Sequence, residues 1–282
     1  MSKAPLSSVV ACAVALMACS LPAGAQTSSE RGRLEFVVRV TPASGRVEPA
    51  RGLTIFLLRK SYREIRREAD DKTPRPDQDE FIDHLQFGPE LKEWMKKQHS
   101  VTIVGPEFRQ RVSADDLFRI PEFLDAYVNS NLSALNQGFP PPKYDSEDRT
   151  RNPKKYEANR KAYEVLLRKY LAAHPDSKEG MDTILGQVDP ANAWGIELMH
   201  WRERSHARAL EMAQTDYLAA KTETNLDGAG AFEAVPGAYW LSTLDGEALG
   251  GELHLRWDAS VEVRAGAVTR AELNNLNAEK QP

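Results

Sequence analysis

Four side chains that could hold a metal ion recur at intervals of three in the C-terminal half of the chain: Glu197, His200, Glu203 and His206. A Glu-x-x-His pair is the motif that di-iron helix bundles use, but those bundles need a second such pair on another helix. Both Glu-x-x-His pairs of this sequence lie in this one segment, and none occurs elsewhere in the chain. Residues three apart on a helix also drift by about 60° per step around its axis, so the four side chains do not converge on one ion. We therefore expect no metal and no cofactor here.

The same segment has an apolar periodicity in which Glu203 and His206 take part. Positions alternating by three and four residues form one helical stripe, which consists of Ile196, Met199, Glu203, His206, Leu210, Ala213 and Tyr217. A buried carboxylate and a buried imidazole are costly unless they are partnered. We therefore predict that Glu203 and His206 are buried and bind each other as a structural polar pair. The alternatives are that they line a polar ligand pocket, or that they act in catalysis.

No catalytic motif accompanies these residues. The sequence lacks His-Glu-x-x-His, Gly-x-Ser-x-Gly and a Gly-Lys phosphate loop, each of which would indicate a definite chemistry. The net charge of −4 also argues against the basic surface that nucleic acid requires. We expect a protein that is not an enzyme and does not bind nucleic acid. The alternative is a hydrolase or a metal-dependent enzyme whose site lies in the helical region, which holds five histidines: His84, His99, His174, His200 and His206.

The elements that would position these residues change character twice along the chain. The 282 residues have 41% hydrophobic and 28% charged side chains, which is typical of a soluble globular protein. Residues 26–61 alternate like strands, residues 62–218 have helical periodicity, and residues 219–282 again read as short strands with regular turns. Because two strands alone do not make a stable sheet, we predict an α+β fold in which an antiparallel β-sandwich is interrupted by an all-helical insertion. The alternative is a hairpin, a helical domain and a separate C-terminal sheet.

Local signals predict several element boundaries. Ser113 and Asp116 have the spacing of a capping box, and Pro121 is expected to begin a helix. Asp189 followed by Pro190 is expected to begin the longest helix, with Asp189 as its N-cap.

A stretch of the C-terminal strand region, residues 224–241, resembles the carboxypeptidase regulatory-like domain. The resemblance lies in a Thr, an Asp-Gly turn, a strand with Phe, a Val-Pro-Gly turn and a strand with Tyr, which are here Thr224, Asp227-Gly228, Phe232, Val235-Pro236-Gly237 and Tyr239. It implies a transthyretin-like (prealbumin-like) sandwich. Asp227-Gly228 is expected to close a hairpin, and Phe232 and Tyr239 are expected to point inward from neighbouring strands. The family's opening Gly-x-Val is replaced by Arg39-Val40, and nothing resembles the separate catalytic zinc unit of carboxypeptidases.

The N-terminus reads as an export signal. Lys3 precedes an apolar segment at 6–16, and Ala23-Gly24-Ala25 has the small-x-small pattern of a cleavage site, so residues 1–25 are expected to be a signal peptide. The alternative is a lipobox, Leu16-Met17-Ala18-Cys19, with lipidation of Cys19. No later segment has the roughly 20 apolar residues of a membrane span. We therefore expect a periplasmic or secreted protein, or a membrane-anchored lipoprotein, whose partner is a protein or glycan of the cell envelope.

Overall fold

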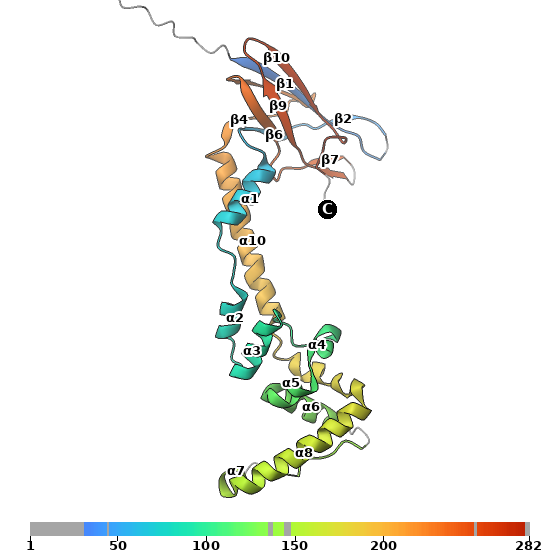
Figure 1. Ribbon diagram of the computed structural model, residues 1–282. Helices are drawn as coiled ribbons and strands as arrows, with labels where there is room; N and C mark the ends of the chain where they lie inside the picture. The colour runs from blue at the N-terminus through green and yellow to red at the C-terminus, as the bar shows by residue number, and fades with distance from the viewer. Residues whose placement is uncertain (1–30, 44, 135–137, 144–147, 251–252, 280–282) are drawn as a thin grey trace, which may run out of the picture.

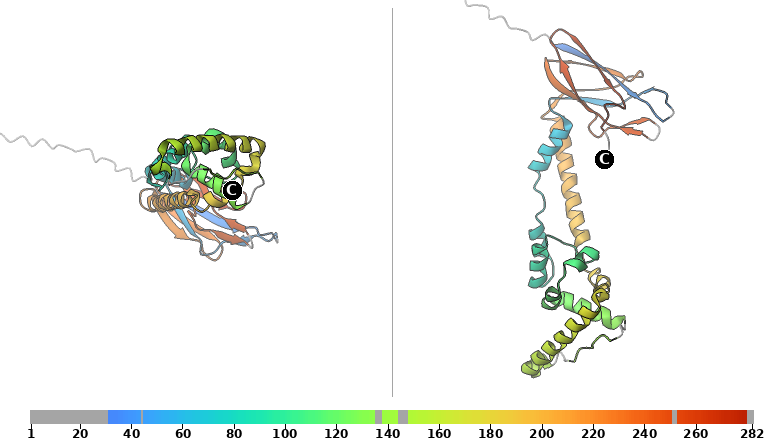
Figure 2. Two further views of the ribbon diagram at one scale, coloured as in Figure 1. Left: turned by 90° about the horizontal axis from the view of Figure 1, so that it is seen from below. Right: turned by 45° about the vertical axis from the view of Figure 1, so that its right-hand side comes forward.

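The computed structural model describes residues 31–43, 45–134, 138–143, 148–250 and 253–279. The expected signal peptide 1–25 and Cys19 lie outside these residues. The chain has an α+β fold with an elongated shape: strands lie at one end, most helices lie at the other, and two helices join them (Figures 1 and 2). We call these two helices the neck; they are α1 (Tyr62–Lys72) and α10 (Ala191–Gln214).

Two main sheets make up the β end. One has β1 at its centre, parallel to β10 and antiparallel to β5 and β2, and the other has the order β4-β3-β6-β9; β7 and β8 form a separate pair. The strands are β1 (Gly32–Val40), β2 (Glu48–Pro49), β3 (Thr54–Leu58), β4 (Leu218–Glu223), β5 (Ala229–Ala234), β6 (Gly237–Ser242), β7 (Ala248–Gly250), β8 (Leu253–Leu255), β9 (Asp258–Val263) and β10 (Val268–Leu273).

The two sheets share one hydrophobic core. The alternation of apolar residues places every second side chain of a strand on the same face, and β1 accordingly buries Leu34, Phe36, Val38 and Val40. This core also contains Ile55, Leu57, Phe232 and Tyr239, so the expectation that Phe232 and Tyr239 point inward is confirmed.

The helical segment leaves and re-enters the β end at neighbouring strands. β3 pairs antiparallel with β4, with Thr54 opposite Glu223 and Leu58 opposite Leu218. Strands from both ends of the chain therefore contribute to both sheets. The alternative of an N-terminal hairpin and a separate C-terminal sheet is wrong.

Two expectations about turns are also wrong. Gly228 has the positive φ (73°) of a tight turn, but the strands on either side, β4 and β5, belong to different sheets and do not form a hairpin. Phe232 and Tyr239 both point into the core, yet their strands are not neighbours, because β5 pairs with β1 whereas β6 pairs with β3 and β9. Both turns carry the chain from one sheet to the other.

The far end is a helical bundle with its own core. Its elements are α2 (Gln78–His84), α3 (Pro89–Lys97), α4 (Pro106–Arg111), α5 (Ala114–Arg119), α6 (Pro121–Ser133), α7 (Asp148–Arg151), α8 (Pro153–Ala173), a 3-10 helix (Pro175–Lys178) and α9 (Met181–Leu185). The predicted capping box of Ser113 and Asp116 is confirmed, as is the helix start at Pro121. Trp94, Phe108 and Phe123 pack edge to face at the centre of the bundle.

The neck is fastened to the β end by a third cluster of apolar side chains. Leu58 of β3 and Leu244 of the β6–β7 turn pack there with Tyr62 and Ile65 of α1 and Met212 of α10. Asp258 of β9 also caps α1 from outside the helix. Its carboxylate accepts hydrogen bonds from the Tyr62 and Arg63 amides at 3.0 and 3.2 Å.

The longest helix departs from its predicted start and its predicted buried face. It begins at Ala191 after Pro190, and Asp189 does not cap it; the Asp189 carboxylate instead accepts hydrogen bonds from the Ile103 amide and the Thr102 hydroxyl. The buried face consists of Ser205, Ala209, Met212 and Ala213. No described helix has a stretch apolar and long enough to cross a membrane.

Candidate functional site

Glu203 and His206 lie on the neck, and both are exposed. Ile196 and Met199, which belong to the same predicted stripe, are 43% and 45% exposed. The predicted burial of Glu203 and His206 is therefore wrong, as is that of the N-terminal part of the stripe. The C-terminal end of the stripe does pack against other side chains: Ala213 is buried, and Leu210 and Tyr217 are partly buried. The reason is tertiary: α10 spans the gap between the two ends of the molecule, and α1 packs along the C-terminal part of α10. The face of α10 that α1 covers includes the small residues Ser205 and Ala209.

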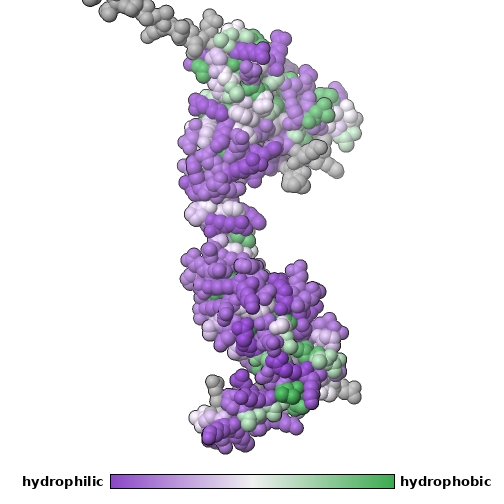
Figure 3. Space-filling view, in the orientation of Figure 1, coloured by the Kyte–Doolittle hydropathy of each residue, from purple (hydrophilic) through white to green (hydrophobic). Residues whose placement is uncertain are grey.

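The two residues border an open hollow of about 500 Å³ between α1 and α10, which we call the neck hollow. Its lining is Arg66, Asp70, Trp201, Arg202, Glu203, Ser205, His206 and Ala209. Figure 3 shows the neck as the narrowest part of the visible surface, which is mostly hydrophilic. Both residues therefore line a surface hollow instead of forming a buried pair.

Several hydrogen bonds hold the wall of the neck hollow in place. Ser205 on α10 donates its hydroxyl to the carboxylate of Asp70 on α1. The indole Nε1–H of Trp201 donates to the Thr73 carbonyl at 3.0 Å, and the guanidinium of Arg75 lies 5.5 Å from the centre of the indole. The hollow is thus lined by side chains that are already positioned.

His206 binds a partner that the sequence did not indicate. Its Nε2 lies 2.9 Å from a carboxylate oxygen of Asp245, on the turn after β6. Nearby, burial raises the pKa of the Tyr62 hydroxyl, and the negative charge of Asp245 raises it further, so Tyr62 stays protonated. His206 therefore ties the neck to the β end, and the expected Glu203–His206 pair is not formed.

The other histidines of the helical region serve local structure or stand apart. His84 and His174 each place Nδ1 near the backbone carbonyl four residues earlier, and His174 stacks on Tyr170. Within the described residues, no group of three or more His, Cys, Asp or Glu side chains is placed to hold a metal ion. In the Asn225-Asp227-Gly228 segment, the side-chain oxygen of Asn225 accepts hydrogen bonds from the backbone amides of Asp227 and Ala229.

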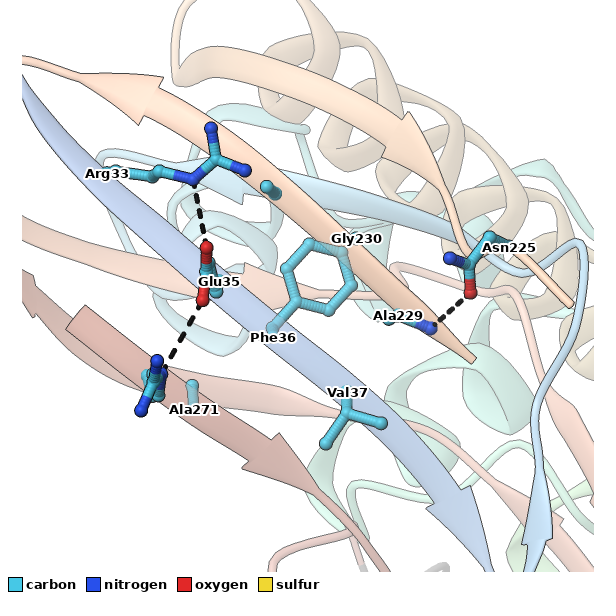
Figure 4. Close-up of a pocket in the computed structure, with 10 residues that line it drawn as sticks. Arg33, Glu35, Phe36, Val37, Asn225, Ala229, Gly230 and Ala271 are labelled. Atoms are coloured by element: carbon cyan, nitrogen blue, oxygen red, sulfur yellow. Dashed lines mark hydrogen bonds and ion pairs between the residues drawn. The ribbon is translucent and has the colours of Figure 1, made fainter. Parts of the chain in front are cut away.

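A second hollow, of about 510 Å³, lies over β1, β5 and β10, and we call it the sheet hollow (Figure 4). Its lining combines small side chains with charged or amide side chains. The small or apolar residues include Val37, Ala229, Gly230 and Ala231, and the charged or amide ones are Arg33, Glu35, Asn225 and Arg270.

The charged side chains of the sheet hollow form ion pairs around a single carboxylate. Glu35 lies between two arginines, with oxygens 3.0 Å from Arg33 Nε and 3.5 Å from Arg270 Nε (Figure 4). Gly230 leaves room for the ring of Phe36, because a Cβ at this position would lie 2.4 Å from that ring. Sequence reasoning missed this site. The sequence signal that could have indicated it is the alternating set Arg33, Glu35 and Val37 on the outer face of β1. Two of these residues pair with alanines on β5.

Searches against protein-family models, curated proteins and solved structures find no match for this chain.

Proposed function

We propose that the protein is an exported, non-enzymatic protein of the cell envelope that binds a partner protein or glycan. In this proposal its β end is a carboxypeptidase regulatory-like, transthyretin-like sandwich, and residues 62–218 are a helical insertion in it. The pairing of β3 with β4 supports the insertion, because the helical segment then begins and ends at adjacent strands.

The residues that carry the family resemblance have structural tasks that fit this proposal. The buried Thr224 hydroxyl donates to the Ala50 carbonyl at 2.7 Å and accepts from the Leu53 amide at 2.9 Å. The Tyr239 hydroxyl donates to the Val235 carbonyl at 3.0 Å, across the link between the two sheets. Each of these residues fixes a point at which the chain changes direction.

The sheet hollow is the observation that carries the binding function. Protein interfaces commonly combine an apolar centre with a polar rim, and the hollow combines Val37, Ala229 and Ala231 with the ion-paired charges of Glu35 and its two arginines. Because these charges already have partners, a docking side chain would not strand an unpaired ion. This lining favours a partner that inserts an apolar group.

Filling the hollow tests the proposal. Ala231 is exposed and faces outward from β5, so Ala231→Trp would occupy the hollow without disturbing the core. Glu233→Trp is the matched control, since Glu233 is an exposed residue of the same strand and does not line the hollow. Purified wild-type protein and both variants would be immobilised and exposed to envelope proteins and surface polysaccharides of the source organism.

The proposal predicts that a binder is found and that Ala231→Trp lowers its affinity about tenfold or more, a loss of about 1.4 kcal/mol in binding free energy. Glu233→Trp should leave the affinity unchanged. An affinity that Ala231→Trp leaves unchanged, or the absence of any binder, would contradict the proposal. Export is tested separately by mass spectrometry of the protein from the envelope fraction. An N-terminus at Gln26 is expected, whereas a lipid on Cys19 would support the lipoprotein alternative.

A further inference from the structure

The neck hollow presents two guanidinium groups from two different helices. Arg66 of α1 and Arg202 of α10 both line it. Neither has a hydrogen-bond or ion-pair partner among the residues that the structure describes. The two arginines therefore offer hydrogen-bond donors to a ligand without first having to break an existing ion pair, and a guanidinium binds a carboxylate through two parallel hydrogen bonds.

The same hollow also presents a carboxylate and an indole. Glu203 lies next to Arg202 on the rim and, like the arginines, has no hydrogen-bond or ion-pair partner in the described part of the chain. The indole of Trp201 forms part of the wall and is held by its hydrogen bond to Thr73. The hollow thus offers donors, an acceptor and an apolar ring surface within about 500 Å³, a volume in the range of small-molecule sites.

We propose that the neck hollow binds a saccharide that carries a carboxylate group. The carboxylate would bind Arg66 and Arg202, hydroxyl groups would donate to Glu203, and the C–H face of the sugar ring would pack on Trp201. This site is distinct from the sheet hollow, so the inference does not depend on the partner that binds there.

The mixed charge of the lining favours this class of ligand over a purely anionic one. A phosphate or an acidic peptide segment would also satisfy the arginines, but neither has the several hydroxyl donors for Glu203 and the C–H ring face for Trp201 that a sugar acid carries beside its anion. A neutral sugar would satisfy Glu203, but its hydroxyl oxygens would give the two guanidinium groups only neutral acceptors, which bind them more weakly than a carboxylate does. A sugar acid supplies an anion, hydroxyl donors and an apolar ring face in one small molecule.

Nuclear magnetic resonance of the full protein tests this proposal at the site itself. The indole N–H signal of Trp201, assigned with the variant Trp201→Phe, would be followed while tri-galacturonate is added. Maltotriose, inorganic phosphate and a tri-glutamate peptide are the comparison ligands. Arg66→Gln and Arg202→Gln are the test variants. Arg67→Gln and Arg204→Gln are their controls, because these exposed arginines are sequence neighbours that do not line the hollow.

The expected result is a saturable shift of the Trp201 signal with tri-galacturonate. Its dissociation constant should rise about tenfold or more in each test variant and stay unchanged in both controls. Equal binding of maltotriose would show that the arginines do not select the ligand, and equal binding of phosphate or tri-glutamate would show an anion site that is not specific for saccharides. Each of these outcomes would overturn the proposal. So would a titration in which the Trp201 signal does not move, or control variants that weaken binding as much as the test variants do.

Discussion

The cap that Asp258 supplies to α1 should contribute measurably to stability. Its carboxylate accepts hydrogen bonds from the Ser61 hydroxyl at 2.5 Å, the Tyr62 amide at 3.0 Å and the Arg63 amide at 3.2 Å. Asp258→Ala removes all three. Because water can reach the first turn of α1 around the exposed Arg63, the loss should resemble that of an N-cap, at about 1–2 kcal/mol. For a protein of this size the corresponding fall in Tm is about 2–8 °C.

Thermal unfolding followed by circular dichroism would measure this loss. Asp258→Asn should fall between the wild type and Asp258→Ala, since an amide keeps one acceptor oxygen of the two. Asp71→Ala is the control, because Asp71 is an exposed carboxylate near the other end of α1. A Tm for Asp258→Ala that equals the control value would refute the view that β9 fixes the start of the neck.

Three further predictions concern stability. Hydrogen bonds, chiefly from a neighbouring lysine, lower the pKa of Glu68 to about 2, so Glu68 stabilises the fold above its unfolded pKa and loses this effect as the pH falls toward about 2. Between about pH 5 and pH 3, the Tm of Glu68→Gln should therefore fall by less than the Tm of the wild type. An equal fall of Tm in both proteins would contradict this. Glu203→Leu should change the unfolding free energy by less than about 0.5 kcal/mol, and His206→Leu by about 1 kcal/mol at most. Their effects should add in the double variant, whereas recovery in the double variant would show that they interact. Gly230→Val should cost about 1–3 kcal/mol in chemical denaturation, because its Cβ would collide with Phe36; an unchanged midpoint would contradict this packing.

Much of the β end could be predicted from the sequence because its signals are local and periodic. The alternation of Phe36 and Val38 identifies the buried face of β1 without knowledge of its neighbours. Which strands pair with one another could not be predicted in this way. Asp227-Gly228 identifies a turn, but the turn residues do not determine whether the next strand returns to the same sheet or crosses to the other.

The neck could not be predicted from the helical pattern for a physical reason. Periodicity shows which apolar residues share a face, but burial needs a second element to cover that face. Ile196 and Met199 share a face that α1 does not cover, and α10 buries Ser205 and Ala209 instead, because small side chains let α1 approach closely. The partner of His206 could not be predicted from the sequence either, because Asp245 lies on the β6–β7 turn, which only folding brings beside α10.

Native-state hydrogen exchange of the intact chain tests most directly whether the helices are inserted into a continuous β structure. If they are, amides of β3 and β4 should exchange with the same opening free energy as those of β1, because all three belong to one cooperative unit. Amides in the core of the distal bundle, such as those of α6, should form a separate group. If β3 and β4 instead exchanged together with α6 and apart from β1, the β end would not be a single unit into which residues 62–218 are inserted.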